Sequence, residues 1–151
     1  MNPLSLDRAL LTSTAALLDQ GRRLDRLSCW LTFAGVVGLL ALSFGSELGP
    51  TPMSLIVLSV LAGLAELYLA ARVGFDLALF RQLLENAGFD ASDLAGLDSA
   101  LSRLGLIPTA KVGRPLDQRA LGACRLLYAQ AVSLALQVAF IVAGAAIAAL
   151  R

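Results

Sequence analysis

The segment 126–150, LLYAQAVSLALQVAFIVAGAAIAAL, contains 25 consecutive residues and no charged side chain. A helix needs about 20 apolar residues to cross the ~30 Å hydrocarbon core of a bilayer. This segment is long enough to cross with some tilt, and it is too uniformly apolar for an ordinary helix of a soluble protein. It therefore predicts an integral membrane protein, and the rest of the chain is interpreted in that light.

Two other segments have the same character. Residues 27–44, LSCWLTFAGVVGLLALSF, carry no charge, and Trp30 near their start suits the headgroup region. Residues 53–71, MSLIVLSVLAGLAELYLAA, carry a single charge, Glu66. The intervening residues 45–52 are rich in Gly and Pro, which predicts a short loop. We therefore expect three transmembrane helices, at 27–44, 53–71 and 126–150.

The overall composition agrees with a membrane protein. Of 151 residues, 58% are hydrophobic and 15% are charged, whereas about 25% of the residues of soluble domains are charged. The net charge of +1 gives no reason to expect a nucleic-acid partner. The chain has no His, and Cys29 and Cys124 lie too far apart for a metal-ligand motif. We therefore expect no metal and no cofactor.

Residues 1–26 predict an amphipathic helix from about Ser5 to Gln20, with a break or bend at Gly21. The evidence is a leucine at every seventh position in two registers, Leu4, Leu11 and Leu18 beside Leu10, Leu17 and Leu24. Such a helix fits equally well on the membrane surface and against other cytoplasmic helices.

Residues 72–125 predict a cytoplasmic helical segment between the second and third spans. Its first helix can continue directly from the second span, and a second helix follows with leucines at helical spacing up to Gly105. Pro115 suits the first turn of a helix that runs on into the third span. The expected fold is all-α: three transmembrane helices, an N-terminal amphipathic helix, and a cytoplasmic helical hairpin.

The acidic residues of this segment do not predict a metal site. Asp90, Asp93 and Asp98 lack the alternating ligands, the glycine and the final glutamate of a calcium-binding loop. Helix capping and a solvated helix face are the expected roles of these three side chains.

The basic residues predict the orientation. Eleven of the twelve Lys and Arg residues lie before the first span or between the second and third, and the twelfth is Arg151. The positive-inside rule places that side in the cytoplasm, with the 45–52 loop and the C-terminus outside. The richness in Ala, Leu and Gly suggests a bacterial chain, and hence the inner membrane.

A polar cluster is predicted among the spans: Thr32, Glu66, Gln130, Ser133 and Gln137. Thr32, Glu66 and Gln130 enter their spans to a similar depth, so these three side chains are expected at one level. Gln130, Ser133 and Gln137 share one helix face. Polar side chains in lipid commonly join helices, and this is the favoured role: Glu66 bonds Gln130, or reaches Arg125 or Arg72, and locks the bundle. The alternative is a proton or cation site with Glu66 as the titrating group.

Small residues recur at four-residue spacing: Ser59 and Gly63 in the second span, and Ala131, Ala135, Ala139 and Ala143 in the third. This spacing lets helices approach closely. Packing within the three-helix bundle and an interface between copies of the chain explain the pattern equally well.

No motif for catalysis is evident. Neither cysteine has a histidine to activate it, and there is no phosphate-binding glycine loop. The sequence favours a non-enzymatic scaffold or accessory subunit of a membrane complex. The alternative is a homo-oligomeric ion or proton channel, or small transporter, that uses Glu66 and the face of Gln130 and Gln137. The expected partners are membrane lipid and either a second copy or another membrane protein.

The orientation is tested by replacing Ser46 with cysteine in a chain lacking Cys29 and Cys124. A membrane-impermeant thiol reagent should label Ser46→Cys in intact cells, because the 45–52 loop is expected outside. Labelling that requires permeabilised cells would reverse the predicted topology.

Overall fold

The described part of the chain forms four helices. The computed structural model describes residues 3–44, 49–85, 91–105 and 113–150. The helices are α1 (Pro3–Ser43), α2 (Pro50–Glu85), α3 (Ala91–Arg103) and α4 (Leu116–Ala149). These residues include no strand. The all-α prediction is confirmed. Residues 45–48 of the expected 45–52 loop, Ser46 among them, lie outside the described residues. The expectation is wrong for residues 50–52, which are the first residues of α2.

Three of the four helices are long and apolar enough to cross a membrane. They contain 41, 36 and 34 residues, which corresponds to lengths of about 50–60 Å at 1.5 Å rise per residue. Because the hydrocarbon core is only ~30 Å thick, each helix is long enough to continue well beyond it. The expectation of three membrane-spanning helices is confirmed at this level.

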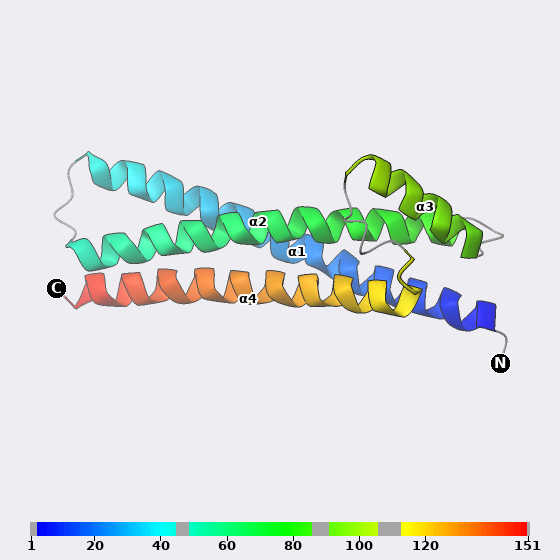
Figure 1. Cartoon of the computed structure of the whole chain (residues 1–151). Helices are drawn as coiled ribbons and strands as arrows, with labels where there is room; N and C mark the ends of the chain where they lie inside the picture. Colours follow the sequence, from blue (N-terminus) through cyan, green and yellow to red (C-terminus); the bar gives the residue numbers. More distant parts are fainter. Residues whose placement is uncertain (1–2, 45–48, 86–90, 106–112, 151) are drawn as a thin grey trace.

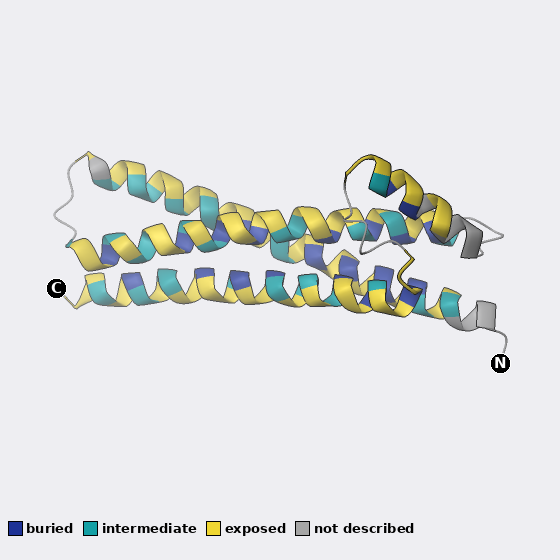
Figure 2. Cartoon of the chain, in the orientation of Figure 1, coloured by how far each residue is buried: buried dark blue, intermediate teal, exposed yellow. Residues whose placement is uncertain are grey.

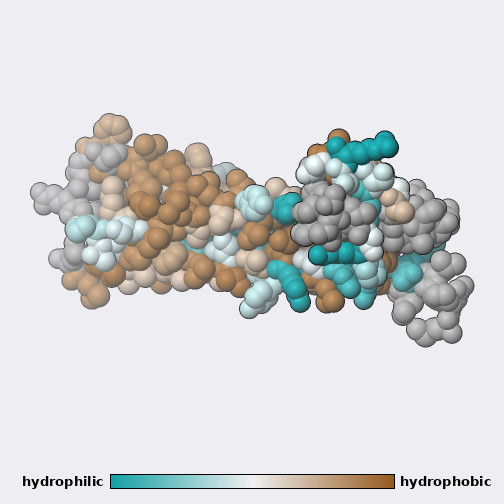
Figure 3. All heavy atoms as spheres, viewed as in Figure 1, coloured by the Kyte–Doolittle hydropathy of each residue, from teal (hydrophilic) through white to brown (hydrophobic). Residues whose placement is uncertain are grey.

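The three long helices lie side by side, with α2 running opposite to α1 and α4 (Figure 1). Hydrophobic residues dominate the end that holds the α1–α2 connection and the C-terminus, and hydrophilic residues gather at the other end (Figure 3). We call residues 27–44, 50–71 and 126–149 the apolar half. The charged half consists of residues 3–26, 72–85, 91–105 and 113–125. At the outer end of the apolar half, α2 lies between α1 and α4.

Proline marks the start of each long helix. Pro3 and Pro50 are the first residues of α1 and α2, and Pro115 is the residue immediately before α4. The first four N–H groups of a helix have no partner within it, so a residue without an N–H costs nothing there. Pro115 is extended, with φ −63° and ψ 156°, and thus ends the preceding turn. The expected start of the last helix at Pro115 agrees with this geometry.

The predicted break at Gly21 is wrong, since α1 is helical from Pro3 to Ser43. The structure assigns this glycine a packing role. A Cβ at Gly21 would lie 3.0 Å from both Gln130 Oε1 and Leu127 Cδ1, and 3.3 Å from Val73 Cγ1. Gly21 therefore lets α4 and α2 approach α1 closely. Residues 5–20 are the first part of this same long helix, and they are not a separate element.

One line of buried residues follows each long helix through both halves, and most of its members recur every seventh position (Figure 2). We call it the heptad seam. Its members are Leu11, Thr14, Leu18, Gly21 and Ser28 on α1; Pro52, Ser59, Glu66, Val73 and Phe80 on α2; and Leu116, Ala123, Gln130, Gln137 and Gly144 on α4. A seven-residue period keeps one face of each helix toward its neighbours, as in coiled coils.

In the charged half, the seam belongs to a hydrophobic core. Leu18 and Leu77 are fully buried there, together with Leu11, Val73 and Phe80. Among the leucines of the first 26 residues, Leu11 and Leu18 belong to this core, whereas Leu17 is 47% exposed. Residues 5–20 thus pack against helices, which was one of the two placements the sequence left open.

The short helix α3 is held by a buried ion pair. Asp98 is 1% exposed and accepts hydrogen bonds of 2.6 Å from Arg119 Nη2 and of 2.7 Å from the backbone N–H of Gly113. Gly105 closes the helix with φ +68°, a conformation that favours glycine. The expectation of a solvated acidic face is therefore wrong for Asp98. Asp90 lies outside the described residues, as does the side chain of Asp93.

Protonation of Asp98 should release α3. Burial opposes ionisation of this carboxyl, but the hydrogen bonds from Arg119 and Gly113 and the Arg119 charge outweigh it, so the pKa of Asp98 lies below its ordinary value. The pair then stabilises α3 docking above the unfolded-state pKa of about 3.9, and the stabilisation is lost as pH falls through the folded-state pKa.

Hydrogen–deuterium exchange of residues 91–103 measures this effect. We expect Asp98→Asn to raise exchange at pH 7 at least tenfold, or about 1.4 kcal/mol of local opening. Glu85→Gln, a change at an exposed carboxylate, should leave exchange unaltered. Equal protection in Asp98→Asn and wild type would contradict the role given to the pair.

Candidate functional site

The candidate site consists of the polar side chains of the apolar half that hydrogen-bond between helices, which we call the polar ladder: Ser28, Thr32, Glu66, Gln130, Ser133 and Gln137. Glu66, Gln130 and Gln137 are each 0% exposed. All three belong to the heptad seam, and Gln130 and Gln137 are seven residues apart on α4. In lipid the apolar faces gain nothing by leaving solvent, so polar contacts between helices become the specific ones.

The first rung joins all three helices through Gln130. Its Nε2 donates to Glu66 Oε1 on α2 at 2.8 Å and to the carbonyl oxygen of Gly21 on α1 at 3.0 Å. Both acceptors lie within reach because Gly21 has no side chain to keep α4 away. This rung lies where the apolar half meets the charged half.

The second rung is built on Gln137. Its Nε2 donates to Thr32 Oγ1 at 2.8 Å and more weakly to the Ser28 carbonyl at 3.4 Å, while its Oε1 accepts from Ser28 Oγ at 2.8 Å. Both ends of the buried amide therefore have partners. Sequence reasoning missed Ser28, although its position one helical turn before Thr32 places it on the same face.

Ser133 and Gly63 bring α2 and α4 together between the rungs. Ser133 Oγ donates to the carbonyl oxygen of Ala62 at 2.9 Å. A Cβ at Gly63 would overlap Thr32 Oγ1 and would lie 2.6 Å from Gln137 Nε2. The second rung therefore exists only because residue 63 is glycine.

The sequence-predicted residues thus separate into two groups. The structure brings Glu66 to Gln130 and Thr32 to Gln137. The expectation that Thr32, Glu66 and Gln130 meet at one level is not met, because Thr32 lies opposite Gly63, about one turn along α2 from Glu66.

Three buried oxygens of the apolar half lack a hydrogen-bond partner within the described structure: Ser59 Oγ, Glu66 Oε2 and Gln130 Oε1. The last two belong to side chains that already share a hydrogen bond. Buried polar atoms are rarely left unpaired, so this pair calls for an explanation.

The small residues take two different positions. Ser59 and Gly63 are buried between the helices. Ala131, Ala135 and Ala139 on α4 are exposed, and Ala143 is half-buried. Within one chain, the first three alanines are thus not used for packing between its helices. The small residue that faces α2 is Gly144, where an added Cβ would lie 3.5 Å from Leu55 Cβ.

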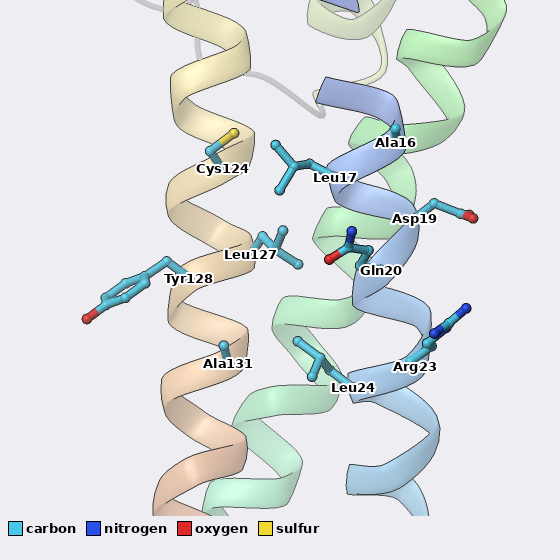
Figure 4. A pocket seen from close by; sticks show the side chains of 10 residues that line it. All are labelled: Ala16, Leu17, Asp19, Gln20, Arg23, Leu24, Cys124, Leu127, Tyr128 and Ala131. Atoms are coloured by element: carbon cyan, nitrogen blue, oxygen red, sulfur yellow. The ribbon is translucent and has the colours of Figure 1, made fainter. Parts of the chain in front are cut away.

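A lateral groove of about 720 Å³ lies between α1 and α4 where the two halves meet (Figure 4). Leu17, Leu24 and Leu127 form much of its wall, and Cys124 and Tyr128 lie along α4. Cys124 has no histidine anywhere in the chain to activate it. Within the described part of the chain, no three Cys, Asp or Glu side chains gather into a metal site.

Comparison with protein-family models, curated proteins and solved structures finds no match to this chain. The function is therefore argued from the helices and the polar ladder themselves.

The close approach at Gly63 is tested by Gly63→Ala. The added methyl group should displace Thr32 from Gln137 and cost about 1–3 kcal/mol of stability, as overpacking does. Gly74→Ala on the same helix is the control: no atom lies within 4 Å of its added Cβ, so the change should be neutral or stabilise by up to about 1 kcal/mol.

Equilibrium unfolding in detergent micelles measures both variants. If Gly63→Ala is as stable as Gly74→Ala, the second rung does not depend on this contact.

Proposed function

We propose that this protein is a non-enzymatic scaffold or accessory subunit of a membrane complex. The proposal rests on one observation: buried polar side chains of the apolar half bond other helices of the same chain. In the apolar half, the amide nitrogens of Gln130 and Gln137 and the hydroxyl of Ser133 bond other helices of the same chain. These groups hold the bundle together, and they leave its outer surface apolar (Figure 3).

The proposed placement has spans at 27–44, 53–71 and 126–150, with residues 1–26 and 72–125 in the cytoplasm of a bacterial cell. Exposed aromatic residues support this boundary, since Trp30, Tyr68 and Tyr128 lie near the junction of the two halves. Exposed arginines lie there too: Arg22, Arg23, Arg26, Arg72 and Arg125. In this placement the end of α2 and the helix α3 form the cytoplasmic hairpin.

The proposed partner surface is the outer face of α4. Ala131, Ala135 and Ala139 are exposed there at four-residue spacing. Small side chains allow a second helix to approach closely in a bilayer, where dispersion contacts replace the hydrophobic effect. The partner that fits this surface is a transmembrane helix, either of a second copy or of another membrane protein.

A homo-oligomeric channel or transporter is the competing function. It would need Glu66 and the face of Gln130 and Gln137 to line a shared aqueous path. All three side chains are 0% exposed inside a single chain, so a path along them would require the bundle to open. The scaffold is therefore the better-supported proposal.

The mass of the complex extracted from native membranes into nanodiscs tests the scaffold function. Native mass spectrometry should give a defined species heavier than one 15.7 kDa chain. Ala135→Leu should reduce this species at least tenfold, because the larger side chain blocks close approach. Ala65→Leu, the same change on the outer surface of α2, should have no effect.

A single chain as the only species, or an unchanged complex in Ala135→Leu, would contradict the proposal. Proteoliposomes separate the competing function: a scaffold conducts no ions, whereas wild-type flux that Glu66→Gln abolishes would establish a channel.

A further inference from the structure

The carboxyl of Glu66 is fully buried and only half satisfied. Its Oε1 accepts from Gln130 Nε2 at 2.8 Å, and its Oε2 has no donor. Gln130 Oε1 is buried and also lacks a donor. Two acceptor atoms without donors thus belong to one hydrogen-bonded pair of side chains.

Rotating the Gln130 amide does not remove the problem. The carbonyl of Gly21 can only accept a hydrogen bond, and it lies 3.0 Å from Gln130 Nε2. Exchanging the nitrogen and oxygen would set an amide oxygen against this carbonyl. The network therefore requires the nitrogen where it lies, and Gln130 Oε1 still needs a proton donor from elsewhere.

The described neighbours supply no cation for Glu66. None of the ion pairs includes it. On α1, Cys29 lies near Glu66, and its thiol is 3.7 Å from the Asp25 carboxylate. The arginines of this part of α1, Arg22, Arg23 and Arg26, are all exposed.

The other two helices add none. On α4, Arg125 and Tyr128 precede Gln130, and both are exposed. Residues 129–149 of this helix have no titratable side chain. On α2 the nearest titratable residues are Tyr68 and Arg72, and both are exposed. A carboxylate at this position would be a buried charge without a counter-ion, which proteins avoid.

We propose that Glu66 binds a proton, and that the O–H of its Oε2 donates to Gln130 Oε1. One proton from solvent then satisfies both orphan oxygens, and no other bond is made or broken. A carboxylic acid and a primary amide have matched donors and acceptors, so the two side chains form a pair with two hydrogen bonds. This proton site is independent of the scaffold function.

With this proton, one hydrogen-bonded network links all three helices at the junction of the two halves. The acid on α2 holds the amide of α4, and the same amide holds the carbonyl of Gly21 on α1. Loss of the proton would place a negative charge beside an amide oxygen that has no donor. The rung would then loosen, and α2 would separate from α4 at this level.

Infrared difference spectroscopy at pH 7 tests the protonation state directly. Wild type minus Glu66→Gln should show the C=O stretching band of one protonated carboxyl, because glutamine lacks that group. Wild type minus Glu85→Gln, at an exposed position, should show carboxylate bands. Carboxylate bands from Glu66 would overturn the proposal.

Stability gives a second, independent readout. Glu66→Gln replaces the O–H by an N–H in the same place, so its unfolding equilibrium at pH 7 should lie within about threefold of wild type. As pH rises, wild type should lose stability before Glu66→Gln does. A tenfold loss in Glu66→Gln at pH 7, or identical pH profiles, would contradict the proton site.

Discussion

The proposed membrane placement sets the constraint on which the rest depends: the same three helices must pack along a single heptad seam in two different solvents. In water, burying apolar surface is itself favourable, and the seam there consists largely of Leu18, Val73 and Phe80. In lipid, leaving the solvent gains little, because the acyl chains are as apolar as leucine. The seam there changes to Ser28, Gln130 and Gln137, whose hydrogen bonds lipid cannot supply.

The change of residue type occurs at the first rung. Gly21 and Gln130 occupy the seam between Leu18 and Ala123 on one side and Ser28 and Gln137 on the other. A glycine there lets the amide of α4 reach the backbone of α1. The position that looks like a helix breaker in the sequence is therefore a point of close approach between two continuous helices.

Amides and hydroxyls suit this seam better than ion pairs. Each charge placed in the apolar half costs several kcal/mol of desolvation, whereas an amide with both ends paired costs far less. Gln137 has partners for both its nitrogen and its oxygen. Glu66 is the exception, and a bound proton makes it equivalent to an amide. Every side chain of the polar ladder is then neutral.

Much of the fold follows from the sequence, because length and hydropathy alone identify helices that can cross a bilayer. The boundaries between segments were harder, since a glycine pattern cannot distinguish a break from a contact until the partner helix is known. The expected solvent exposure of Asp98 is wrong because its partner could not be identified either. Asp98 lies among leucines at helical spacing, and an acid on such a face can indicate a buried ion pair. Arg119, its partner, is 21 residues away.

The candidate site was predictable in most of its members, with Ser28 missed, and only partly in its pairing: Glu66 meets Gln130 as their similar depth predicts, whereas Thr32 bonds Gln137 instead. Glu66, Gln130 and Gln137 stand out as polar residues in apolar segments. Their partners depend on the offset between helices, which a single span does not encode. The seven-residue spacing of Ala123, Gln130, Gln137 and Gly144 is visible in the sequence, and it would have identified the buried face of α4 and excluded the alanine row from it.

Hydrogen bonds between side chains hold the apolar half together. A double-mutant cycle on Thr32→Val and Gln137→Leu, measured by unfolding in bicelles, tests this role. We expect a coupling free energy of about 0.6–2 kcal/mol between the two positions. A coupling indistinguishable from zero would mean that the polar ladder does not stabilise the bundle.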